Sequence, residues 1–255
     1  MELNKIYNED CLVTMERMKN EGVKVDMVLT SPPYNTSRVN NGSTVSHDTR
    51  RYDVYDDTMT NEEYLDFTLK LFQGYDSVLK EKGVILYNIS YGNENPDLIW
   101  HVIHKIITET DFMIADMITW KKKSATPNSV SPNKLTRITE PVFVICRKNE
   151  YDSFMCNKRI TSRRKNGQVH YENVFNLVEA KNNDGSQDLN KATFSSDLVV
   201  KLLEIYAPDG VIVYDSFMGT GTTAAGCKQL GLTYIGSELS PAQCEYAEER
   251  LANYY

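Results

Sequence analysis

Short apolar runs alternate along this chain with stretches in which apolar residues recur at helical spacing. The runs have the length and continuous apolar character of strands buried on both faces, and the intervening stretches are typical of amphipathic helices. This alternation predicts an α/β fold with a doubly wound, mainly parallel sheet. The expected strands are residues 5–8, 25–30, 84–89, 112–120, 141–147, 211–214 and 233–238; the expected helices are residues 12–20, 60–78, 97–110, 195–206, 224–230 and 240–253.

The helix at residues 60–78 carries an explicit start signal. Thr60 and Glu63 have the spacing of a capping box, in which each side chain accepts a hydrogen bond from the backbone of the other residue. Residues 35–59, which precede it, are polar with few apolar anchors, so we expect a long mobile loop there. Lys82 and Gly83 predict a turn into the strand at residues 84–89.

The tetrad Ser31-Pro32-Pro33-Tyr34 directly follows the apolar strand at residues 25–30. Two prolines fix φ and remove two N–H donors, which predicts a stiff turn at the sheet rim whose carbonyls can only accept hydrogen bonds. Tyr34 adds a flat face on which a planar ring can stack. Acceptors beside a stacking face fit the exocyclic amino group of a nucleobase, although the tetrad alone also fits an ordinary turn at the end of a strand.

A second motif, DSFMGTGTT at residues 215–223, follows the strand at residues 211–214. A glycine-rich turn between a strand and a helix lets the backbone approach a ligand closely, and the helix N-terminus presents free N–H groups. The third glycine of the dinucleotide pattern is absent, so the turn alone is a weak signal. Glu238, at the tip of the next strand, lies 17 residues after Gly221, which fits a carboxylate that binds ribose hydroxyls. It also fits a cap of the helix that begins near Ser240.

Together these motifs resemble those of the S-adenosylmethionine-dependent DNA amino-methyltransferases of the circularly permuted class β. That family has a Ser/Asp/Asn-Pro-Pro-Tyr catalytic motif first, then a target-recognition region, and an F-x-G-x-G cofactor motif last, the order seen here from Ser31 to Gly221. Methyltransferases of protein glutamine or ribosomal RNA usually have the cofactor motif first. The resemblance spans nearly the whole chain and implies a Rossmann-like, seven-stranded sheet with one antiparallel edge hairpin, in which the motifs meet at the carboxyl ends of the strands.

The resemblance also implies how the chain is divided. Residues 1–120 would be the catalytic half of one methyltransferase domain, residues 121–185 an edge strand with an inserted basic target-recognition region, and residues 186–255 the cofactor-binding half. Asp10 and Cys11 resemble an element near the cofactor adenine, although Asp10 also fits a helix N-cap. The implied catalytic residues are Ser31, Pro32, Pro33 and Tyr34; the implied S-adenosylmethionine ligands are Asp10, Cys11, Thr193, Phe194, Asp215, Phe217, Gly219, Gly221, Thr222, Thr223 and Glu238.

Charge is distributed unevenly along the chain. The whole chain has 28 basic and 35 acidic residues and a net charge of −7, yet residues 121–165 hold twelve basic and three acidic residues, which leaves 16 and 32 for the rest. Such a segment is typical of a polyanion-binding surface, although charged runs are often only solvated faces. Beside the catalytic motif it predicts contacts with the phosphates of duplex DNA. The expected DNA-binding residues are Lys121, Lys122, Lys123, Arg137, Arg159, Arg163, Arg164 and Lys165.

Cysteine usage and hydropathy narrow the class of protein further. The five cysteines include no C-x-x-C pair, so we expect neither a metal site nor a disulfide framework, but reduced thiols in a cytoplasmic protein. The chain has no Pro-Cys dipeptide, which removes the nucleophile that cytosine-C5 methyltransferases need. No apolar run is long enough for a membrane span, and the polar start does not fit a signal peptide.

These observations predict a site-specific enzyme that flips a base out of duplex DNA and methylates its exocyclic amino nitrogen. In the family that the chain resembles, Ser at the first motif position goes mainly with N4 of cytosine and Asp or Asn with N6 of adenine, so the resemblance favours cytosine as the target of Ser31. A hydroxyl can accept from the amino group and donate to the adjacent ring nitrogen. Adenine offers the same two groups, so N6 of adenine is the alternative. A non-catalytic DNA-binding protein with a methyltransferase fold is the second alternative. Besides DNA, a second copy of the chain and a cognate restriction endonuclease are candidate partners.

Overall fold

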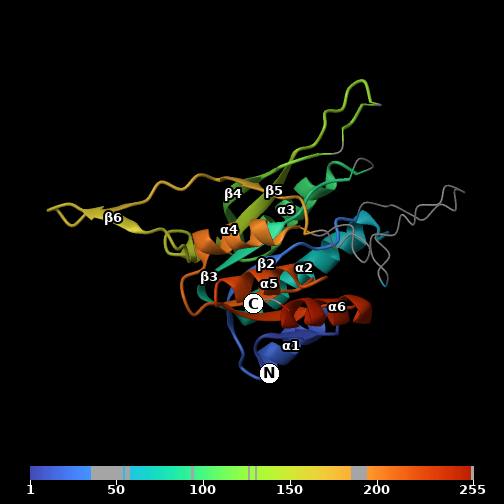
Figure 1. The fold of residues 1–255 in the computed structure, drawn as a ribbon, viewed down its shortest axis with the longest axis horizontal. Coiled ribbons are helices and arrows are strands. Elements are labelled where there is room, and N and C mark those ends of the chain that lie inside the picture. The colour runs from blue at the N-terminus through green and yellow to red at the C-terminus, as the bar shows by residue number, and fades with distance from the viewer. Residues whose placement is uncertain are drawn as a thin grey trace, which may run out of the picture.

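A computed structural model describes residues 1–35, 54, 58–92, 95–125, 127–129, 131–184 and 194–253. Its main sheet contains β1 (Lys5–Tyr7), β2 (Val25–Thr30), β3 (Leu79–Asn88), β4 (Phe112–Lys122), β5 (Thr139–Arg147), β8 (Leu177–Ala180), β9 (Ile212–Asp215) and β10 (Thr233–Ser237). The strands lie in the order β1-β10-β9-β2-β3-β5-β4-β8, and within this sheet only β5 runs antiparallel to its neighbours (Figure 1). The predicted mainly parallel, doubly wound sheet is confirmed.

The strand count differs from the expected seven because β8 adds an eighth strand parallel to β4. With four residues, β8 is too short for its alternating burial to stand out in the sequence. The antiparallel pair β4–β5 therefore lies one strand inside the sheet margin. In addition, β3 begins at Leu79 and not at residue 84. The predicted turn at Lys82 and Gly83 therefore lies inside the strand, where Lys82 has a left-handed φ of 60°.

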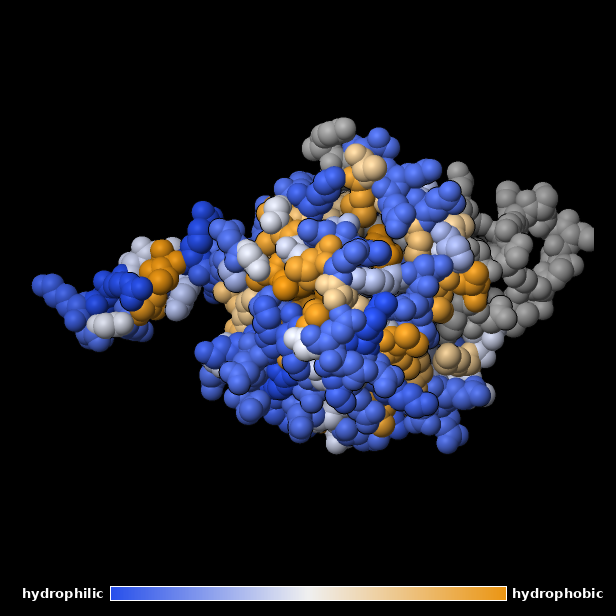
Figure 2. Space-filling model, turned by 90° about the horizontal axis from the view of Figure 1, so that it is seen from below, coloured by the Kyte–Doolittle hydropathy of each residue, from blue (hydrophilic) through white to orange (hydrophobic). Residues whose placement is uncertain are grey.

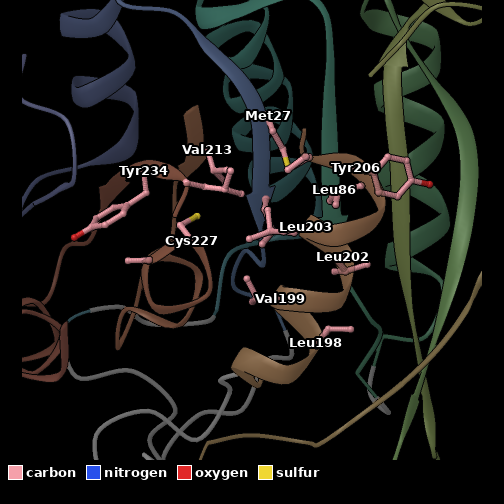
Figure 3. Packing of buried hydrophobic residues seen from close by; sticks show 14 of the residues in the cluster. Met27, Leu86, Leu198, Val199, Leu202, Leu203, Tyr206, Val213, Cys227 and Tyr234 are labelled. Atoms are coloured by element: carbon pink, nitrogen blue, oxygen red, sulfur yellow. The ribbon is translucent and has the colours of Figure 1, made fainter. Parts of the chain in front are cut away.

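Helices cover both faces of the sheet. α1 (Cys11–Asn20), α2 (Asn61–Val78) and α3 (Leu98–Glu109) pack on one face, and α4 (Ser196–Tyr206), α5 (Thr222–Gln229) and α6 (Pro241–Ala252) pack on the other. Because successive strand residues point to opposite faces, Met27 of β2 packs toward α4 while Val28 packs toward α1–α3. Figure 3 shows the α4 side of this core, where Leu202 and Leu203 of α4 gather with Met27 and Leu86 of the strands. The result is a three-layer α/β domain.

The capping box at the start of α2 is confirmed. The backbone N–H of Glu63 donates to Thr60 Oγ1 at 3.2 Å, and the N–H of Thr60 donates to Glu63 Oε2 at 2.8 Å. The helix then buries Tyr64, Leu71 and Tyr75 against the sheet. Most of the predicted loop at residues 35–59 lies outside the described residues.

A separate two-stranded hairpin, β6 (Ile160–Arg163) and β7 (Val169–Tyr171), projects from the body (Figures 1 and 2). Two backbone hydrogen bonds hold the chain that leads into the hairpin. The N–H of Met155 donates to the Lys82 carbonyl at 2.7 Å, and the N–H of Asn157 donates to the Ile205 carbonyl at 2.8 Å. Both carbonyls lie toward the amino ends of the neighbouring parallel strands. The hairpin therefore leaves the molecule on the side opposite the carboxyl ends of those strands, away from the β4–β5 connection.

Candidate active site

The turn formed by Ser31–Tyr34 lies at the carboxyl end of β2 and is held from α2. Tyr64 Oη donates to the Pro33 carbonyl at 2.5 Å. Asn35, which follows the turn with φ of 50°, donates from Nδ2 to the Met59 carbonyl at 2.8 Å. The turn is thus fixed on the buried face of α2, and the Pro33 carbonyl already accepts a hydrogen bond from that helix.

The Tyr34 hydroxyl is the centre of a polar cluster at the ends of three strands. It lies 3.2 Å from Ser31 Oγ, 3.0 Å from Asn88 Oδ1 and 3.5 Å from Glu140 Oε2. Asn88 ends β3 and Glu140 is in β5. Neither residue was predicted, because each is a single polar residue at a strand end and no spacing links it to the tetrad.

A cavity of about 280 Å³ opens beside the tetrad. It is bounded by the start of α1, by α2, by the glycine-rich turn before α5, and by the chain that follows β10. The predicted residues that line it are Asp10, Cys11, Phe194, Phe217, Gly219, Thr222 and Glu238, together with Ser31 and Pro33. Lining residues that the sequence did not single out include Glu9, Leu12, Phe67, Leu239 and Gln243. Thr193 lies outside the described residues.

Two carboxylates at the cavity also shape the backbone around it. Glu238 accepts at Oε2 from the N–H of Gly219 and at Oε1 from the N–H of Ser240, both at 2.8 Å. It therefore joins the glycine-rich turn to the start of α6 while it lines the cavity. Asp10 caps α1 by accepting from the N–H of Leu12 at 2.7 Å. For Glu238 and Asp10 the sequence left two roles open, a helix cap or a cavity residue. Both side chains bind backbone N–H groups at a helix start and also line the cavity.

Three of the predicted cofactor residues lie behind the cavity instead of lining it. Asp215 is buried and accepts from Thr30 Oγ1 at 2.7 Å, from the N–H of Phe217 at 3.0 Å and from Thr223 Oγ1 at 2.5 Å. Burial raises the pKa of Asp215 to about 6. Gly221, with φ of 79°, packs against α6. Asp215, Thr223 and Gly221 thus hold the shape of the glycine-rich turn.

The chemistry of the lining fits S-adenosylmethionine. Three carboxylates, Glu9, Asp10 and Glu238, meet aromatic and aliphatic side chains, and the described lining includes no Lys or Arg. Carboxylates accept hydrogen bonds from ribose hydroxyls and attract the sulfonium and ammonium charges of that cofactor. A nucleotide with several phosphates would instead meet repulsion from the same carboxylates. Gly219, with φ of 55°, provides a turn without a side chain at the cavity wall.

The structure divides the predicted DNA-binding residues into separate groups. Lys121 pairs with Glu179 at 2.7 Å and Lys122 with Glu140 at 2.5 Å, so both lysines at the end of β4 already have anionic partners.

Arg137 lies near the carboxyl end of β3, where it donates to the Tyr91 carbonyl at 2.5 Å and stacks on the Tyr91 ring. Arg159 pairs with Glu172 at the base of the β6–β7 hairpin. Arg163, Arg164 and Lys165, here called the hairpin tip, are exposed, and the β6–β7 hairpin that carries them projects from the body on the side opposite the carboxyl ends of the strands (Figure 1).

Comparison with known proteins gives a consistent result. The model of the DNA methylase family matches residues 25–249. The type II methyltransferase M.HinfI of Haemophilus influenzae is 24% identical over 98% of this chain and 68% of its own length. The orphan methyltransferase M.BamHII of Bacillus amyloliquefaciens is 25% identical over 90% of this chain and 89% of its own length.

Solved structures share the fold. The M1.HpyAVI–SAM complex has a TM-score of 0.67 at 20% identity, with 97% of this chain and 98% of that chain covered. PvuII DNA methyltransferase, described as cytosine-N4-specific, has a TM-score of 0.66 at 18% identity, with 98% and 90% covered. Within the described residues no helix is long and apolar enough to cross a membrane, and no cluster of His, Cys, Asp or Glu is arranged to hold a metal ion.

Proposed function

Because this chain belongs to the DNA methylase family of S-adenosylmethionine-dependent enzymes, we propose that it methylates N4 of cytosine in duplex DNA. The observation that carries methylation of an amino nitrogen is the position of Ser31, which lines the cofactor cavity and also contacts the Tyr34 hydroxyl. Serine at this motif position and the shared fold of a cytosine-N4-specific enzyme both support cytosine. N6 of adenine is the alternative target within the same family.

The reaction requires an amino lone pair that is normally delocalised into the base. When bound, S-adenosylmethionine supplies an electrophilic methyl group on its sulfonium. Acceptors such as Ser31 Oγ and the Pro32 carbonyl would hold the amino hydrogens, draw the nitrogen toward tetrahedral geometry and localise its lone pair. Tyr34 would stack on the flipped base, and most of the rate enhancement would come from this positioning.

We assign cofactor binding to the cavity residues named above. Glu238 already accepts two backbone hydrogen bonds, but a carboxylate has about four acceptor positions, so it can also accept from ribose hydroxyls. Asp215, Thr223 and Gly221 would support binding indirectly through the shape of the glycine-rich turn.

The direct test is methylation of mixed-sequence duplex DNA with labelled cofactor, followed by nucleoside mass spectrometry. We expect N4-methylcytosine; N6-methyladenine would select the alternative target. Label only in RNA or protein, or in no substrate, would contradict the proposed activity.

Two variants separate the enzyme from a non-catalytic DNA-binding protein. Tyr34→Ala should lose most turnover yet keep its cofactor affinity in calorimetry, because one base-stacking contact is worth about 1–3 kcal/mol. Glu238→Ala should lose cofactor affinity, with circular dichroism as the control for folding. Equal cofactor affinity in the wild type and in Glu238→Ala would show that the cofactor does not bind at Glu238.

Duplex DNA is the partner that follows from this activity, and we assign its contacts to residues 121–185. The type II names of several relatives support a cognate restriction endonuclease as a second partner. Self-association into a homodimer is a further expectation, which sedimentation of the purified protein measures.

A further inference from the structure

We propose that Asn88 is a positioning residue that makes Ser31 face the target base as a hydrogen-bond acceptor. The inference rests on the proposed methyltransferase function and extends it to a residue outside the catalytic tetrad. It follows from the directions of the hydrogen bonds that join Asn88, Tyr34 and Ser31.

The first step is the orientation of the Asn88 amide. Its Nδ2 donates to the Pro141 carbonyl at 3.0 Å. A proline carbonyl can only accept, so the nitrogen must face Pro141 and the oxygen must face Tyr34. Asn88 is 5% exposed, so the reversed amide would bury two acceptors against each other.

The second step is the single proton of the Tyr34 hydroxyl. Asn88 Oδ1 lies 3.0 Å away and can only accept, as can Glu140 Oε2 at 3.5 Å. The other oxygen of Glu140 is held by Lys122 at 2.5 Å. Both neighbours therefore draw the Tyr34 proton toward β3 and β5, and away from Ser31.

The third step follows at Ser31. Its Oγ lies 3.2 Å from Tyr34 Oη, and because the Tyr34 proton points away, the Ser31 hydroxyl donates in this contact. The lone pairs of Ser31 are then available to the cavity that it lines. An amino group of a flipped base donates to them, whereas a keto oxygen at the same position meets acceptor against acceptor.

This arrangement removes the physical argument that linked the Ser31 hydroxyl to cytosine, so the expectation of cytosine rests on the resemblance alone. The Ser31 hydrogen is used on Tyr34, so Ser31 recognises an amino group without donating to the adjacent ring nitrogen. Selection of an amino base then comes from Ser31, and the choice between cytosine and adenine comes from other contacts in the pocket.

A double-mutant cycle tests the inference. Asn88→Leu should lower the single-turnover methylation rate about tenfold, the value of one hydrogen bond to the reacting amine, with cofactor affinity unchanged. Asn88→Asp keeps an acceptor toward Tyr34 but loses the donor to Pro141, and should retain most of the rate. In a Tyr34→Phe background, Asn88→Leu should have no further effect.

The contrary outcomes are distinct. If Asn88→Leu costs as much in the Tyr34→Phe background as alone, Asn88 acts by holding β3 to β5 and the inference is wrong. An active wild type whose rate is unchanged by Asn88→Leu would also overturn it. A wild type that methylates no DNA would instead overturn the proposed function.

A binding measurement gives a second readout. Once the target base is mapped, we compare affinities for duplexes with the target amino base or with uracil at that position. Wild-type protein should favour the amino base more than Asn88→Leu does, because Ser31 in the variant can turn its hydrogen toward a keto oxygen. The same pair of duplexes is used for both proteins, so the effect of the mismatch cancels. An equal preference in both proteins would contradict the inference.

Discussion

The carboxylate of Asp215 is buried away from water. Its three hydrogen-bond donors offset only part of the free-energy cost of burying the ionised form. Burial raises its pKa from 3.8 to about 6, so the native state binds a proton more readily than the unfolded state between these values. The unfolding free energy should therefore fall as pH rises from about 4 to 6, by up to about 3 kcal/mol, and level off above. Urea unfolding of wild type and Asp215→Asn from pH 4 to 7 measures this.

In that comparison the quantity of interest is the difference between the two proteins, because other groups titrate in both. The wild type should lose stability relative to Asp215→Asn as pH rises through this window. A difference that stays constant with pH would mean that Asp215 is ionised throughout.

Some residues of the site could be assigned from local sequence patterns, and others could not. Gly219 and Glu238 could be assigned from sequence because motif spacing alone brings them to adjacent strand ends. Asn88 and Glu140 could not, because they meet only through the pairing of β3 with β5. The sequence could not show that the Asp215 side chain is buried among the donors of Thr30, Phe217 and Thr223 instead of lining the cavity.

At the scale of elements, the close packing of α5 on α4 depends on Gly226. A methyl group there would lie 2.4 Å from Val199 Cγ1. Alanine has the higher helix propensity, by about 1 kcal/mol, but overpacking a core typically costs about 1–3 kcal/mol. We expect Gly226→Ala to lower the unfolding free energy in urea, and to become neutral or stabilising beside Val199→Ala. A more stable single variant would show that the two helices can move apart freely.

Element contacts show what the charge pattern along the sequence leaves out. The run Lys121–Lys123 counts as a basic cluster along the sequence, yet β4 lies between β5 and β8, which carry Glu140 and Glu179. Counting along the chain cannot detect partners supplied by neighbouring strands. The same is true of β8 itself, whose four residues become a recognisable strand only beside β4.

At the scale of the whole molecule, the hairpin that carries the tip projects on the side opposite the carboxyl ends of the strands, at which the cavity opens. Replacing all three tip residues with Ala should weaken binding to long duplexes and reduce the salt slope by about 0.9 for each phosphate that the protein no longer neutralises. Cofactor affinity and the single-turnover rate on saturating DNA should not change, because the tip is remote from the tetrad. Fluorescence anisotropy over a salt series measures the slope.

The matched control removes three exposed lysines on other elements, Lys5, Lys19 and Lys70. If both triple variants alter the slope equally, only net charge matters and the tip is a solvated face. If the tip variant instead loses single-turnover rate, the tip reaches the duplex that the cavity engages.

The pairing of β1 with β10 joins Lys5 to Ile235 across nearly the whole chain, and β2 likewise needs β9, where Met27 pairs with Val213. A ribosome makes this protein from its amino end, so β2, the strand before the tetrad, emerges long before its neighbouring strand β9 has been made. Until β9 is made, the backbone N–H and C=O groups along one edge of β2 are unpaired in the nascent chain, and such an edge can pair with strands of other chains. Translation speed and chaperone access while the last strands are made should therefore influence how much of this protein reaches its native state.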